Sequence, residues 1–75
     1  MAFRMIAKIS LIDGSREVQV CAENFTHTEA EDIIQEYITL CDYDKEEPYV
    51  EQFISWANQK YANPNTPKSF WAKWT

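Results

Sequence analysis

Gly14, the only glycine in the chain, separates two stretches whose apolar residues alternate with polar ones. Such a period of two is typical of a strand with one buried face. The apolar positions before the glycine are Phe3, Met5, Ala7, Ile9 and Leu11, and those after it are Val18 and Val20. We expect Asp13-Gly14 to form a two-residue type I′ turn, since glycine accepts positive φ. The sequence therefore predicts an antiparallel hairpin with Ile9 opposite Val18 and Ala7 opposite Val20.

A helix is predicted after the hairpin, because two overlapping capping boxes precede a run with helical period. Thr26 with Glu29 and Thr28 with Glu31 are the two candidates, and the sequence does not decide between them. At 100° per residue the apolar side chains of this run fill one arc, and the carboxylates lie opposite them. The arc consists of Ala30, Ile33, Ile34, Tyr37, Ile38, Leu40 and Cys41.

A second helix is expected to begin at Pro48, since proline suits the first helical position. Its apolar stripe is Val50, Phe53, Ile54, Ala57 and Tyr61. Tyr49 and Trp56 lie on one edge of that stripe. The prolines at positions 64 and 67 end the helix before the aromatic C-terminal segment.

With 75 residues, the chain is long enough for a single domain with one small core. The predicted fold is α+β, a two-stranded antiparallel hairpin packed against two helices (ββαα). Residues 63–75 are expected either to fold back as a short aromatic segment or to form a C-terminal arm. The hairpin would have two open edges, so pairing of hairpins into a homodimer is a further hypothesis.

Negative charge is concentrated in the middle of the chain. Residues 17–51 hold eleven of the twelve carboxylates against a single lysine, Lys45. Because phosphate binding needs accumulated Lys and Arg, we expect no direct contact with nucleic acid. No apolar run reaches the roughly 18 residues of a membrane span, so no membrane partner is expected. Without an export signal, Cys21 and Cys41 are expected to be free thiols and the location cytoplasmic.

The sequence offers no pattern typical of a catalytic, cofactor or metal site. His27 is the only histidine, and neither cysteine is predicted to lie beside it. Asp42-x-Asp44-x-Glu46 resembles the start of a calcium loop, but the positions that need glycine and the closing glutamate are wrong. We therefore expect a protein that is not an enzyme and that needs no cofactor or metal.

Two sets of residues are candidates for binding a partner. Carboxylates three and four positions apart on a helix form a dense negative row, here Glu29, Asp32 and Glu36. Such a row can imitate nucleic acid, and the alternative is a solvated face that keeps the protein soluble. The second set is aromatic and supplies contact area at low cost in rotamer entropy: Tyr49, Trp56, Trp71 and Trp74. For the tryptophans the alternative is that they cover the core.

The order of elements carries one resemblance. The hairpin ending in Val18 to Ala22, followed by the threonine-capped acidic helix from Thr28 to Ile34, resembles a layout of small phage-encoded inhibitors of host machinery. The likeness covers about residues 3–40. Those proteins often continue with a third strand, whereas this sequence instead has Pro48 and a second predicted helix.

These observations predict a small acidic protein-binding modulator. It resembles a phage-type inhibitor that acts in the host cytoplasm on a protein that handles nucleic acid, through the acidic helix face. The alternative prediction is a structural or assembly component that docks through its Trp-rich C-terminal tail.

Overall fold

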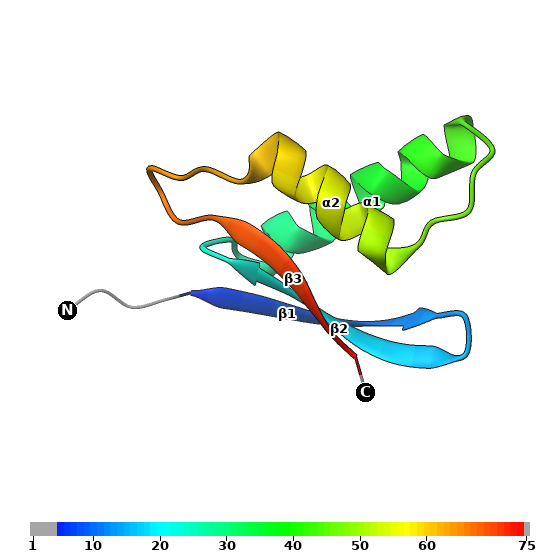
Figure 1. Ribbon diagram of the computed structural model, residues 1–75, viewed down its shortest axis with the longest axis horizontal. Coiled ribbons are helices and arrows are strands. Elements are labelled where there is room, and N and C mark those ends of the chain that lie inside the picture. The colour runs from blue at the N-terminus through cyan, green and yellow to red at the C-terminus, as the bar shows by residue number, and fades with distance from the viewer. Residues whose placement is uncertain (1–4, 75) are drawn as a thin grey trace.

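The computed structural model describes residues 5–74 as one antiparallel sheet covered on one face by two helices (Figure 1). The elements follow one another as β1 (Ile6–Asp13), β2 (Arg16–Glu23), α1 (His27–Tyr43), α2 (Val50–Tyr61) and β3 (Ser69–Trp74). The α+β class is confirmed. The predicted two-stranded sheet is wrong, because the C-terminal segment adds a third strand in the order β1-β2-β3.

The hairpin has the predicted faces but a different register. Ile9 lies opposite Val20, and Ala7 lies opposite Ala22, so the pairing is shifted by two residues from the prediction. The turn is formed by Gly14 and the residue after it, and Gly14 at φ 66° is its only residue with positive φ. That pattern fits a type II′ turn, which needs glycine at its first central position, rather than type I′. A shift of two keeps every side chain on its predicted face.

The aromatic C-terminal segment is folded back as β3 along the free side of β2. Ala22 pairs with Phe70, and Val18 pairs with Trp74. The central strand β2 thereby gains neighbours on both sides, and Val18, Val20 and Ala22 are each at most 2% exposed. Phe3 and Arg4, predicted at the start of the first strand, lie outside the described residues.

Helix α1 begins with the first of the two candidate capping boxes. The Thr26 side chain accepts a hydrogen bond from the Glu29 backbone N–H at 3.1 Å, and the Glu29 carboxylate accepts one from the Thr26 N–H at 2.9 Å. Two orphan N–H groups of the first turn are satisfied in this way. Ile38 and Leu40, placed in the apolar arc by the sequence, are 39% and 41% exposed because they lie at its two edges.

Helix α2 begins at Val50 rather than at Pro48, and its N-terminus is capped from a distant segment. Tyr49 occupies the N-cap position without a side-chain hydrogen bond to the helix. Instead, the Val50 N–H donates to the Asp13 carboxylate at 3.3 Å. A carboxylate at this end also suits the helix dipole. The hairpin tip and α2 are therefore joined.

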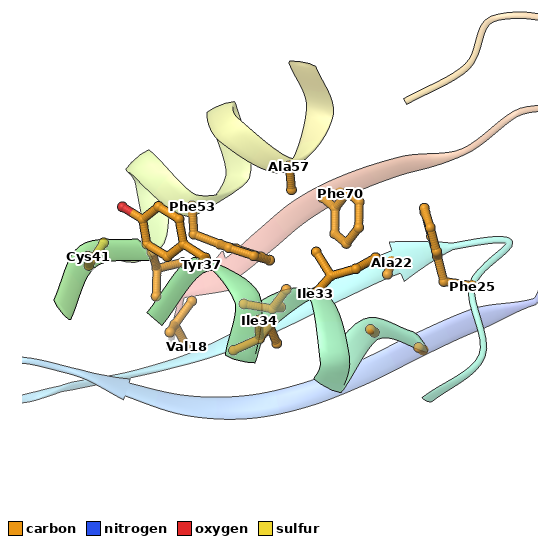
Figure 2. Close-up of a cluster of buried hydrophobic side chains, with 14 residues drawn as sticks. Val18, Ala22, Phe25, Ile33, Ile34, Tyr37, Cys41, Phe53, Ala57 and Phe70 are labelled. Carbon is orange, nitrogen blue, oxygen red and sulfur yellow. The ribbon is translucent and has the colours of Figure 1, made fainter. Parts of the chain in front are cut away.

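The core lies between the helices and one face of the sheet (Figure 2). Aromatic rings from α1, α2, β3 and the connection between β2 and α1 meet there in tilted and edge-on contacts. The Phe53 and Phe70 centroids are 5.8 Å apart, and the Phe25 and Phe70 centroids are 4.7 Å apart. Tyr37 of α1 packs edge-on against Phe53 of α2 at 5.4 Å. Burial raises the pKa of the Tyr37 phenol to about 12, so the ring stays neutral.

Within residues 5–74, neither helix has the length and hydropathy needed to cross a bilayer.

Candidate protein-binding surface

The predicted acidic row lies together on α1, along a surface hollow of ≈ 340 Å³. Glu29, Asp32 and Glu36 line this hollow with Tyr61 and Lys68 from the opposite side. The sequence thus predicted the row, but the lysine that faces it comes from a segment far along the chain.

Glu36 is bound within the molecule. Its carboxylate is paired with the Lys60 ammonium, and it accepts a hydrogen bond from the Tyr61 hydroxyl at 2.5 Å. The hydrogen bond from Lys60, followed by that from Tyr61, lowers the pKa of the Glu36 carboxyl. The hydrogen bond to the Glu36 carboxylate in turn raises the pKa of the Tyr61 phenol. This carboxylate therefore joins α1 to α2.

Glu29 also has a structural role, since its carboxylate completes the capping box. The backbone hydrogen bond from Thr26 is the main cause that lowers the pKa of the Glu29 carboxyl, and the charge of nearby Lys68 adds to it. Lys68 itself lies over the Phe25 ring at 4.8 Å. Of the predicted row, only the exposed Asp32 carboxylate forms no hydrogen bond or ion pair with another residue of the described part of the chain.

A denser acidic surface lies at the other end of α1, which we call the acidic end. It comprises Asp42, Asp44, Glu46 and Glu47, all exposed, on the last turn of α1 and on the connection to α2. Figure 1 shows this connection at the same end of the molecule as the β1–β2 turn. Cations suit the C-terminus of a helix, and carboxylates there cost stability. The last turn of α1 holds no basic residue.

The backbone of the acidic end has a defined conformation. Lys45 is in the left-handed region at φ 57°, and the Glu46 N–H donates to the Cys41 carbonyl at 2.8 Å. The Lys45 N–H donates to the Asp42 carbonyl at 3.2 Å. Together these bonds form a Schellman motif, in which glycine usually takes the position of Lys45. The carboxylates are thus presented from an ordered helix end.

Two tyrosines lie among these carboxylates. Tyr43 is 85% exposed, and Tyr49 is 47% exposed with its hydroxyl donating to Glu47 at 3.0 Å. Tyrosine is enriched among the residues that anchor protein interfaces. The sequence analysis named Tyr49 but missed Tyr43. The signal for Tyr43 was its position outside the apolar arc of the helix, between two aspartates.

The three predicted tryptophans lie apart from the acidic end and from one another. Trp56 is half-buried against Tyr37, with ring centroids 5.4 Å apart. Trp74 packs at the border of the core under the Arg16 guanidinium, 4.7 Å from the ring centroid. Trp71 is half-buried on the opposite face of the sheet, in register with Cys21.

The groups that could carry chemistry are dispersed. Cys21 and Cys41 are free and buried, and His27 pairs through Nε2 with the exposed Glu31 carboxylate at 2.7 Å. Among residues 5–74, no three His, Cys, Asp or Glu side chains are arranged to hold a metal ion.

Comparison of the chain with protein-family models, with curated proteins and with solved structures finds no match.

Proposed function

We propose that this protein is a small modulator that binds another protein through the acidic end of α1. The supporting observation is the position of Asp42 and Asp44. They lie at a helix terminus where each carboxylate costs about 0.3–1 kcal/mol of stability. A chain selected for stability alone favours lysine or arginine there.

The chemistry of the surface indicates a basic partner. Asp42, Asp44, Glu46 and Glu47 surround a single lysine, and Tyr43 and Tyr49 offer aromatic anchors beside them. Complementary charge increases the association rate and excludes acidic competitors. Proteins that bind nucleic acid carry a basic surface, which would be complementary to these carboxylates. The proposed partner is therefore a protein that handles nucleic acid. Occupation of that surface would inhibit it, as in the phage-type inhibitors that the layout resembles.

The row of Glu29, Asp32 and Glu36 contributes less to this proposed surface than the sequence predicts. Glu36 is paired with Lys60, and Glu29 closes the capping box, so their charges are largely used inside the molecule. Asp32 remains available on the same solvent face of α1 and extends the acidic end along the helix.

The test uses proteins that a DNA column retains from a cell lysate as the pool of candidate partners. The immobilised wild-type protein is expected to capture a member of this pool, and added duplex DNA is expected to release it. The variant Asp42→Asn with Asp44→Asn should capture at least about tenfold less at the same salt concentration. A control variant, Lys73→Gln on the exposed sheet face, should capture as the wild type does.

Equal capture by the acidic-end variant would contradict the proposed surface. Capture that duplex DNA does not reduce would contradict nucleic-acid mimicry.

A further inference from the structure

The outer edge of β1 carries unpaired backbone groups. Just before β1, the Met5 carbonyl accepts a hydrogen bond from the Asn24 N–H at 2.6 Å. The odd-numbered residues of β1 therefore direct their backbone N–H and C=O groups toward β2. The alternate residues direct theirs outward: Ile6, Lys8, Ser10 and Ile12. No hydrogen bond from within residues 5–74 reaches these outward groups.

The opposite edge of the sheet is capped near the start of β3, at Phe70. On β3, the Phe70 N–H donates to Asn58 Oδ1 at 2.8 Å, and the Phe70 carbonyl accepts from Asn58 Nδ2 at 3.0 Å. The side chain of α2 thereby replaces the next strand at that position. An exposed edge strand is a template for pairing with another chain, and within residues 5–74 no side chain caps the β1 edge in this way.

Apolar surface continues past the β1 edge. Ile12 is 69% exposed, and Ile38 of α1 is 39% exposed on the side that faces the hairpin tip. Together with Leu11 they line a small hollow of ≈ 120 Å³. On the core face, Ile9 is only half-buried although its cross-strand partner Val20 is 1% exposed. Isolated exposed apolar residues are common, but here they follow one edge.

We propose that β1 pairs antiparallel with β1 of a second copy, around a two-fold axis that passes through Ile9. The two three-stranded sheets then form one continuous sheet with all helices on the same face. Ile6 lies opposite Ile12 of the second copy, and Lys8 lies opposite its Ser10. This proposal is argued from the backbone groups and side chains of β1, so it does not depend on the proposed function.

The register follows from the outward groups. Hydrogen bonds between the two β1 strands form only where outward-facing residues lie opposite each other. The proposed alignment pairs all four outward residues of each chain, which gives about eight hydrogen bonds in the dimer. An alignment shifted by two residues in one direction places Lys8 opposite Lys8, which is unfavourable for like charges. The shift in the other direction places Lys8 opposite Ile12 and leaves Ile6 unpaired. The proposed register instead joins the exposed Ile12 to an apolar partner.

Sedimentation equilibrium tests the association, at about 0.3 M salt so that the net charge of −5 per chain is screened. The wild-type protein is expected to dimerise. Ser10→Pro removes one outward N–H and leaves the β1 to β2 hydrogen bonds intact, since proline is tolerated where the N–H faces outward. It should weaken association at least about tenfold while thermal unfolding shows a folded monomer. Ser10→Ala keeps the N–H and should dimerise as the wild type does.

Cross-linking tests the register without depending on the proline variant. In the proposed dimer, the two Ile9 positions face each other as a non-hydrogen-bonded pair, about 4.5 Å apart between Cα atoms, which suits a disulfide. Ile9→Cys should therefore form covalent dimers under mild oxidation, and Ile12→Cys should not. A wild-type protein that stays monomeric at high micromolar concentration, or equal cross-linking by both variants, would overturn the proposal.

Discussion

The side-chain amide of Asn58 pairs with the backbone of Phe70 as a neighbouring strand would, donating at 3.0 Å and accepting at 2.8 Å. This pair fastens α2 to β3, and both of its hydrogen bonds are partly buried. It also caps the β3 edge of the sheet at Phe70, whereas within residues 5–74 no such pair caps the β1 edge.

Asn58→Ala should lower the free energy of unfolding by about 1–2 kcal/mol, because the Phe70 N–H and carbonyl lose their partners. Urea denaturation followed by circular dichroism measures this. Gln59→Ala, at the exposed neighbouring position on the same helix, is the control and should change stability little. Equal stability of the two variants would mean that the amide pair does not hold β3.

Thr26→Ala should destabilise the protein by about 0.5–2 kcal/mol, since the Thr26 hydroxyl caps the Glu29 N–H. Thr28→Ala removes the threonine of the alternative capping box and should cost much less. Thermal unfolding of the two variants compares them directly. A larger loss in Thr28→Ala would show that α1 begins two residues later.

Glu36 should contribute to the dependence of stability on pH. Hydrogen bonds from Lys60 and Tyr61 lower the pKa of the folded carboxyl below its ordinary value of 4.5. The stabilising contribution is therefore complete above this pH and is lost as the pH falls through the folded pKa. Between about pH 5 and pH 3, Glu36→Gln should lose less stability than the wild type. Asp32→Asn should lose as much as the wild type, and identical curves for all three proteins would contradict the prediction.

Asp42→Asn with Asp44→Asn should increase stability by about 0.6–2 kcal/mol at low salt, because two negative charges of about 0.3–1 kcal/mol each are removed from the C-terminal end of α1. The gain should shrink as salt screens the helix dipole. Chemical denaturation at two salt concentrations tests this. Lower stability of the double variant would show that these carboxylates serve the fold.

Local patterns in the sequence predicted the parts of the fold that depend on neighbouring residues. The alternation around Gly14 predicted the hairpin faces. The two overlapping capping boxes predicted the start of α1 to within two residues, and the structure has the first of them. The register was wrong because Gly14 is equally suited to the first or the second position of a two-residue turn, and only the strand pairing decides between them.

The third strand depends on contacts distant in sequence, which local patterns do not contain. Trp71 interrupts the alternation of Phe70, Ala72 and Trp74, so the period of two is weak in this segment. The partner of Phe70 on α2, Asn58, is an ordinary polar residue on the helix. In the same way, the acidic row was visible in the sequence, but the pairing of Glu36 with Lys60 was not.

The central claim is that the acidic end of α1 binds a basic partner. It is tested most directly by the dissociation constant for the captured partner, measured against salt for the wild type and for the variant Asp42→Asn with Asp44→Asn. We expect the wild-type affinity to fall steeply with salt, and the variant to bind at least about tenfold more weakly with a shallower dependence. Equal affinities with parallel salt dependences would contradict the claim.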